Sequence, residues 1–308
     1  MDADWALLDR DFYVDAVMYA VILSGLYLML VEGADNEMIR ELGRNKGFPA
    51  CEIVHTLAQL GVVRYSGQRW LWCGAPPDPR RITRIDAVRR WVHLVPFCEE
   101  ALAPWKHAAD DMRLTDSGQE MNTFLIANIK PSTGMRWLDI GGGTGDLARQ
   151  LSQMGVDVTM LDTPSVIARC RTRSFSSVRL VAGDVLAGLP TGPFDVVSAV
   201  RFLEEFSATQ VRQIFHHMRK QLAPNGIVCV ISSVDDNTLW SKLFAIEVAS
   251  TSPKGRTYSV RTLGILAARE HLALMRMKTH GPYTLIVLRR MTLAGRRKDR
   301  DTMQLVEY

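Results

Sequence analysis

Residues 135–148 read MRWLDIGGGTGDLA, a short apolar run followed by a loop that contains four glycines. The run Met135–Ile140 predicts a β-strand, and the residues from Asp146 onward predict a helix. Because glycine has no Cβ, this backbone can pass tightly against a ligand at the mouth of the helix. The stretch therefore predicts a strand–loop–helix unit that binds a ligand.

The spacing of the glycines indicates which class of ligand the loop binds. A dinucleotide fingerprint requires GxGxxG, and the sixth position counted from Gly141 is Asp146. The loop instead fits an acid, Asp139, at the end of a strand and then GxGxG. The spacing therefore excludes nicotinamide dinucleotide binding.

Further apolar runs of strand length follow, separated by segments of helix length. This rhythm predicts a parallel sheet covered by helices on both faces. The last two runs flank Gly281-Pro282, and a turn this short can join only antiparallel strands. The runs span residues 156–161, 178–181, 194–200, 227–231, 275–280 and 283–288.

Acidic residues stand where successive predicted strands end. Asp162 closes the second strand, and Asp184 follows the third. A single Asp at a strand end is more often a helix cap than a ligand. In open α/β sheets, however, ligands bind outside the carboxyl ends of the strands, where an acid can accept hydrogen bonds from ribose hydroxyls. The ordered series therefore predicts one nucleoside-binding edge.

These motifs resemble those of class I S-adenosylmethionine-dependent methyltransferases. The strand Phe194–Val200 and the later turn Leu222–Gly226 also resemble the fourth strand and pre-strand turn of that family. The resemblance implies S-adenosylmethionine as cofactor and S-adenosylhomocysteine as product. It implies Asp139, Gly141 and Gly143 at the methionine end of the cofactor, Asp162 on ribose and Asp184 near adenine. Val185 and Arg201 complete the expected set of cofactor-binding residues.

The N-terminal region has a different pattern. Helix-like segments at 16–31, 36–44 and 51–60 precede two short strands around Ser66-Gly67, as in a winged helix. The third segment has no Arg or Lys, and the net charge of the chain is only +4. A DNA-recognition helix depends on attraction to phosphates. We therefore expect no nucleic-acid partner and a dimerisation or substrate-covering role.

The apolar run 16–31 predicts a buried helix. It is shorter than the ~20 residues that a bilayer requires, and acids flank it at Asp15 and Glu32. The acidic start of the chain also argues against a signal peptide. Five separated cysteines without metal-ligand spacing indicate reduced thiols in a cytoplasmic protein with no metal site.

The chain is long for a single domain, so two domains with a connection are expected. Pro76-Pro77-Asp78-Pro79 separates a domain at 1–80 from bridging helices at 81–130; the cofactor-binding domain spans 131–292, and a polar tail spans 293–308. The first bridge carries His93, Trp105 and His107, for which packing is a more common role than contact with an acceptor molecule.

The two-part organisation resembles, more narrowly, the dimeric small-molecule O-methyltransferases of secondary metabolism. That family has Leu-His-Asp-Trp-Ser after its fourth strand, with the histidine as general base, whereas Leu203–Ser207 reads LEEFS. Glu204 takes the place of the histidine. The family's later Glu-Arg-Thr motif, whose acid steadies that histidine, is Gly255-Arg256-Thr257 here.

Three hypotheses account for this departure. Glu204 could be the catalytic base, with its pKa raised by burial. The acceptor could be a thioether, an amine or an electron-rich carbon that needs no strong base. The fold could also have given up methyl transfer. A fourth, structural interpretation makes Glu204 and Glu205 caps of the helix that begins near Ala208, with His216 and His217 remote from the strand ends.

The predicted fold class is α/β: a seven-stranded Rossmann-like methyltransferase domain with an α-helical, winged-helix-like N-terminal dimerisation domain. The predicted function is methyl transfer from S-adenosylmethionine to a small, largely apolar or aromatic acceptor, by a homodimer. The alternative is a methyltransferase-like protein that binds the cofactor but catalyses another reaction, such as cyclisation. A winged-helix regulator that senses the cofactor is disfavoured by the cation-free third helix.

Overall fold

The computed structural model describes residues 14–77, 117–172, 177–251, 256–281 and 283–291, apart from residues 15, 16, 19, 23 and 48. The chain divides into two compact units. The first contains residues 1–107 and 233–257, and the second contains 108–232 and 258–308. The predicted bridge 82–111, with His93, Trp105 and His107, and the tail 293–308 lie outside the described residues. The domain boundaries given above stay predictions.

The first unit begins with three helices and a β-hairpin, in the order that the sequence predicts. They are α2 (Leu26–Glu32), α3 (Asn36–Lys46), α4 (Ala50–Gln59), β1 (Val63–Ser66) and β2 (Arg69–Trp72). The helical run that starts before α2 is interrupted at Gly25, whose φ of 80° is left-handed. The Asp35 carboxylate caps α3 by accepting hydrogen bonds from the N–H groups of Glu37 and Met38.

A helix from much later in the chain completes the core of this unit. Helix α11 (Leu239–Thr251) packs against α4. Its Leu243 and Ile246 are buried in one cluster with Leu57 and other apolar side chains of the N-terminal elements. Within the described parts of the chain, no helix is both long and apolar enough to cross a membrane.

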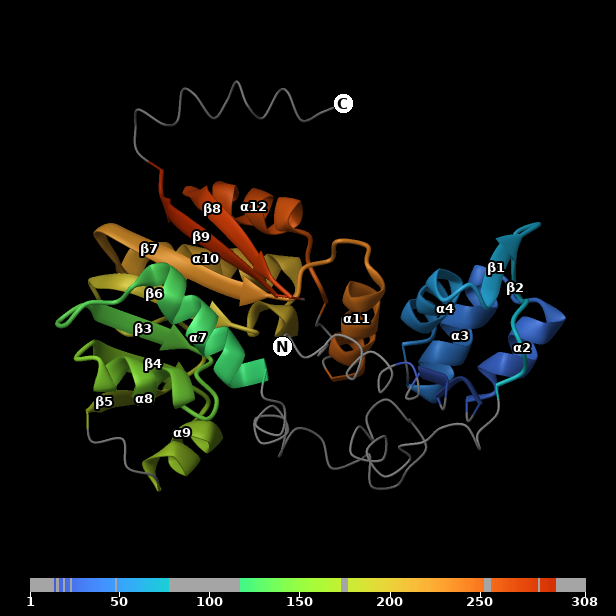
Figure 1. The fold of residues 1–308 in the computed structure, drawn as a ribbon, viewed down its shortest axis with the longest axis horizontal. Helices are drawn as coiled ribbons and strands as arrows, with labels where there is room; N and C mark the ends of the chain where they lie inside the picture. The colour runs from blue at the N-terminus through green and yellow to red at the C-terminus, as the bar shows by residue number, and fades with distance from the viewer. Residues whose placement is uncertain are drawn as a thin grey trace, which may run out of the picture. The chain divides into compact units, whose positions relative to one another are not determined.

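The second unit is a seven-stranded sheet with helices on it (Figure 1). The strand order is β5-β4-β3-β6-β7-β9-β8, with β8 and β9 antiparallel to their neighbours, as predicted. Its elements are α7 (Ser117–Ile129), β3 (Arg136–Ile140), α8 (Asp146–Gln153), β4 (Asp157–Asp162), α9 (Pro164–Arg171), β5 (Val178–Ala182), β6 (Phe194–Val200), α10 (Ala208–Gln221), β7 (Leu222–Ser232), α12 (Val260–Arg269), β8 (Leu272–His280) and β9 (Tyr283–Arg290).

One predicted turn is part of a strand instead. Residues 222–226 belong to β7. Phe194 of β6 pairs with Leu222 and Val196 pairs with Ile227, so β7 contains more residues than β6 between these two pairs. The extra residues form an irregularity in the pairing. Gly226 is required there, since a Cβ would lie 2.7 Å from the carbonyl oxygen of Phe194.

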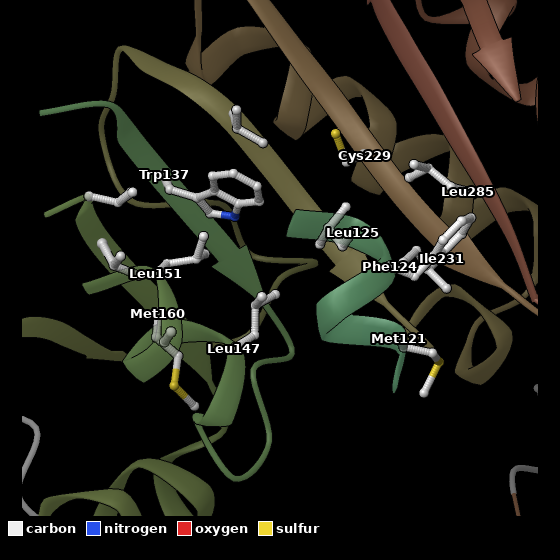
Figure 2. Packing of buried hydrophobic residues seen from close by; sticks show 14 of the residues in the cluster. Met121, Phe124, Leu125, Trp137, Leu147, Leu151, Met160, Cys229, Ile231 and Leu285 are labelled. Atoms are coloured by element: carbon white, nitrogen blue, oxygen red, sulfur yellow. The ribbon is translucent and has the colours of Figure 1, made fainter. Parts of the chain in front are cut away.

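Apolar side chains from α7, α8 and the central strands form a continuous core on one face of the sheet (Figure 2). Trp137 of β3 and Leu151 of α8 are fully buried in it, together with Leu125 of α7. Because alternate residues of a strand face opposite sides, the neighbours of Trp137 in β3 point to the other face. Burial of both faces explains why the strands read as almost continuous apolar runs.

The pairing of β3 determines where the candidate ligand site forms. Strand β3 lies between β4 and β6 in parallel register, so that Asp139 is opposite Met160 on one side and Ser198 on the other. The carboxyl ends of the three strands therefore meet at one edge. The glycine loop, Asp162 and the residues after Val200 emerge there.

Truncation of the core of the second unit should destabilise it strongly. Leu151→Ala removes a fully buried side chain and leaves a cavity, so the free energy of unfolding should fall by about 2–5 kcal/mol. Met154, which is 43% exposed at the end of the same helix, supplies the control Met154→Ala, with an expected change within about 0.5 kcal/mol. Urea unfolding followed by circular dichroism measures both changes. Equal effects would contradict this description of the core.

Candidate functional site

The glycine loop is held in a conformation that other residues adopt at a cost. Gly141 and Gly143 have φ values of 67° and 54°, in the left-handed region. A Cβ on Gly141 would lie 2.2 Å from the ring of Phe202, so the close approach of that ring also requires glycine. A Cβ on Gly143 would meet nothing within 4 Å, which leaves open space beside the loop.

Asp162 links the glycine loop to the end of β4. One of its carboxylate oxygens, Oδ2, accepts a hydrogen bond from the N–H of Gly143 at 2.8 Å. The other, Oδ1, accepts from the N–H of Thr163 at 2.7 Å. The structure thus brings Asp162 and Gly143 together, as one site requires. Each carboxylate oxygen has two lone pairs, so both can still accept from a ligand hydroxyl.

Asp139 is buried below the loop, with only 2% of its surface exposed. Its Oδ1 accepts a hydrogen bond from the hydroxyl of Ser198 at 2.7 Å, and that hydroxyl accepts in turn from Nε1 of Trp137 at 2.8 Å. Burial raises the pKa of Asp139 to about 7, against the effect of the Ser198 hydrogen bond; the nearby Asp162 charge raises it further. Asp139 is therefore a carboxyl group poised to change charge near neutral pH.

Asp184 and Val185 lie in the loop that follows β5. The Asp184 Oδ1 accepts a hydrogen bond from the N–H of Leu186 at 2.8 Å, and Val185 is buried. This contact is a local turn of the loop; it does not cap a helix. The Val185 carbonyl is 2.9 Å from Nδ1 of His217. The sequence predicted that His217 is remote from the strand ends. This prediction is wrong, because the loop after β5 runs beside α10.

A sharp change of direction follows β6. Arg201 has a left-handed φ of 48°, and its N–H donates to the carbonyl of Ile231 in β7. The ring of Phe202, which covers Gly141, also contacts Phe206 edge-on at a centroid distance of 4.9 Å. The hydroxyl of Tyr258 donates to the carbonyl oxygen of Phe206 at 2.6 Å. Aromatic contacts thus hold this segment next to the glycine loop.

Glu204 lies in the short 3-10 turn Leu203–Glu205 and is buried, with 2% of its surface exposed. The hydroxyl of Ser232, at the end of β7, donates a hydrogen bond to its Oε1 at 2.7 Å. The interpretation of Glu204 as a helix cap is wrong. Ser207 caps α10 in a capping box with Gln210, which satisfies the N–H groups of both residues.

Sequence reasoning missed two serines. Ser198 interrupts the apolar strand Phe194–Val200. Ser232 stands directly after the apolar run 227–231. A buried polar residue needs a hydrogen-bonding partner, so each serine was a signal that a polar group lies nearby. The partners, Asp139 and Glu204, become visible only when the strands are paired.

A family model described as "Methyltransferase domain" matches residues 118–274, just over half of the chain. The chain belongs to this methyltransferase-domain family. It is also 31% identical over 121 residues to the ubiquinone biosynthesis O-methyltransferase of Psychrobacter cryohalolentis. That match covers 37% of this chain and 46% of the relative, so the chain spans about half the length of the curated relatives it matches.

Solved structures resemble the chain over most of its length. The O-methyltransferase family 2 protein of Planctomyces limnophilus, in complex with apigenin, has a TM-score of 0.61 and 17% identity and covers 92% of this chain and 94% of its own. Human N-acetylserotonin methyltransferase, in complex with S-adenosylmethionine, has a TM-score of 0.53 and 17% identity and covers 95% and 99%. The α/β Rossmann-like methyltransferase fold with N-terminal helices is therefore confirmed.

The buried Asp139 should make the stability of the protein depend on pH. A raised pKa in the folded state means that folding favours the protonated form of Asp139. Its contribution to the free energy of unfolding is therefore fully present below pH 3.8 and is lost as the pH rises through about 7. Asp139→Asn mimics the protonated form and can still accept from Ser198. When the pH rises from 4 to 8, the free energy of unfolding of the variant should increase by about 4 kcal/mol relative to that of the wild type. Urea unfolding across this range tests it; parallel curves would refute the pKa.

Proposed function

We propose that the protein is an S-adenosylmethionine-dependent methyltransferase that acts on a small, largely apolar or aromatic molecule in secondary metabolism. The observation that carries the proposal is the hydrogen bond between Asp162 and the Gly143 N–H, beside open space at the glycine loop. This contact brings an acid and a ligand-accommodating backbone together at the carboxyl edge of the sheet, where α/β folds bind nucleosides. The match to a methyltransferase domain favours this function over cyclisation.

The residues at this edge suit the chemistry of the proposed cofactor. The glycine loop, with open space beside Gly143, takes the methionine end, above the buried acid Asp139. Asp162 has lone pairs for the ribose hydroxyls. Asp184 and Val185 take the adenine end, and Arg201 completes the proposed set. When bound, S-adenosylmethionine supplies a sulfonium methyl group that is already activated toward nucleophiles.

The names of the structural neighbours support the proposed acceptor class. One was crystallised with apigenin, and another is an N-acetylserotonin methyltransferase. In this chain, the rings of Phe202 and Phe206 contact each other directly after β6, next to the glycine loop. An aromatic acceptor can stack on such rings, which bury a large apolar area.

Glu204 is the proposed catalytic base. It occupies the position of the family's base histidine, and the hydroxyl of Ser232 donates a hydrogen bond to its Oε1. Glu204 takes the proton that an acceptor hydroxyl loses as it is methylated. Ser232 acts as its positioning residue, in place of the family's second acid.

A homodimer formed through the N-terminal helices, with a winged-helix-like arrangement of the first unit, is part of the same proposal. Leu28 and Val31 of α2 are 65% and 51% exposed in the described chain, although both are large and apolar. A second copy can cover this surface. Sedimentation velocity of the purified protein measures the oligomeric state, and a monomer at every concentration would exclude the dimer.

A cytoplasmic location stays a prediction from the cysteines.

Asp162→Ala should abolish cofactor binding. The substitution removes the acceptor for ribose and also releases the N–H of Gly143, so the Kd of S-adenosylhomocysteine should rise at least 100-fold, a loss of about 2.7 kcal/mol. Isothermal titration calorimetry measures the Kd. Glu204→Gln, at the same edge but outside the proposed cofactor contacts, is the control and should bind as the wild type does. A wild type without affinity for S-adenosylhomocysteine would sink the methyltransferase proposal.

Glu204→Gln should then separate chemistry from binding. Glutamine keeps the shape and the hydrogen bond from Ser232 but cannot accept a proton, so kcat toward a hydroxyl acceptor should fall by about 100- to 10,000-fold. A panel of phenols and amines, assayed for S-adenosylhomocysteine release, supplies the acceptors. Ser232→Ala should lower kcat less. Unchanged kcat in Glu204→Gln would reject the base and favour an acceptor that needs none.

A further inference from the structure

Three polar side chains of α10 lie four residues apart and bond to one loop. They are Gln213, His217 and Gln221, a spacing that places them on one face of the helix. We call them the α10 stripe. The loop is residues 183–193, which connects β5 to β6. All three side chains bond to its backbone.

The α10 stripe contacts the loop near both of its ends. Nε2 of Gln213 donates to the carbonyl of Leu186 at 2.7 Å, and Nδ1 of His217 is 2.9 Å from the carbonyl of Val185. The N–H of Gly192 donates to Oε1 of Gln221 at 2.8 Å. A carbonyl can only accept, so Nδ1 of His217 must carry the proton and donate. The first two contacts fall directly after Asp184.

These two contacts constrain the Asp184 carboxylate. Its Oδ1 accepts from the N–H of Leu186, and its own carbonyl accepts from the N–H of Ala187. The residue that orients the carboxylate, Leu186, is therefore the residue whose carbonyl Gln213 holds. His217 fixes the intervening carbonyl of Val185. The direction of the Asp184 side chain thus depends on the α10 stripe.

The helix that carries the stripe is itself anchored on its other side. The His216 ring is hydrogen-bonded to Oε2 of Glu270, at the end of α12, and Nε of Arg212 is 2.8 Å from Oε1 of the same carboxylate. His216 and His217 therefore have opposite roles despite their adjacency. The first joins α10 to α12, and the second joins α10 to the loop.

We propose that His217 and Gln213 are positioning residues that hold Asp184 and Val185 in place for the adenine ring of the cofactor. The inference rests on the proposed function, since it takes adenine as the ligand of this loop. It assigns specificity for the nucleobase to side chains on α10 that lie behind the loop. The methionine end of the site is independent of them.

The test compares His217→Ala with the wild type for binding of S-adenosylhomocysteine and of adenosine, by isothermal titration calorimetry. Loss of one hydrogen bond that preorganises the loop should raise both Kd values by the same factor, about 3- to 10-fold. In the methyl-transfer assay, the KM for S-adenosylmethionine should rise while kcat at saturation stays the same. His217→Asn, whose side-chain amide can donate from nearly the position of Nδ1, should restore most of the affinity.

His216→Ala is the matched control. It removes a neighbouring histidine and one hydrogen bond of the same helix, but not a contact with the loop, so it should lower the Tm without changing either Kd. If His217→Ala does not fold, Gln213→Ala tests the same contact set. A wild type that does not bind S-adenosylhomocysteine overturns the proposed function. A wild type that binds, with folded stripe variants that bind equally well, overturns this inference alone.

Discussion

The parallel pairing of β3 with β4 and β6 is the constraint on which the second unit depends. It aligns three carboxyl ends at one edge and sets Asp139 directly opposite Ser198. A shift of one residue would reverse the faces of β3, removing Trp137 from its core cluster and separating the serine from its acid. Core packing and the polar network below the glycine loop therefore specify the same register. This agreement between levels is typical of a sequence with a single native structure.

Much of this unit could be predicted from the sequence because its signals are local. Apolar runs between helix-length segments indicated the strands, and Gly281 at a short turn indicated the antiparallel pair at the end of the chain. The left-handed backbone at Gly141 was likewise implied by the residue type. Such features depend on neighbours along the chain, which a pattern of letters records directly.

The remainder of the site depends on contacts between distant segments. Glu204 and Ser232 are separated by 28 positions, and Trp137 and Ser198 by 61. Periodicity predicts that such residues are buried, but it does not identify their partners. The alternative of Glu204 as a helix cap fails for a local reason instead, because Ser207 and Gln210 form the capping box of α10. Polar interruptions of apolar strands were the overlooked signal.

Helix α11 has a consequence for the order in which the protein folds during synthesis. Its Leu243 and Ile246 belong to the core of the first unit, and the other buried members of that core among the described residues lie between Val17 and Val63. At about 5–20 residues per second, the ribosome needs on the order of ten seconds or more to reach them after the hairpin is made. The N-terminal helices must wait with an incomplete core while the sheet strands emerge. The N-terminal helices are thus synthesised before the sheet strands, but their core is completed only after most of those strands.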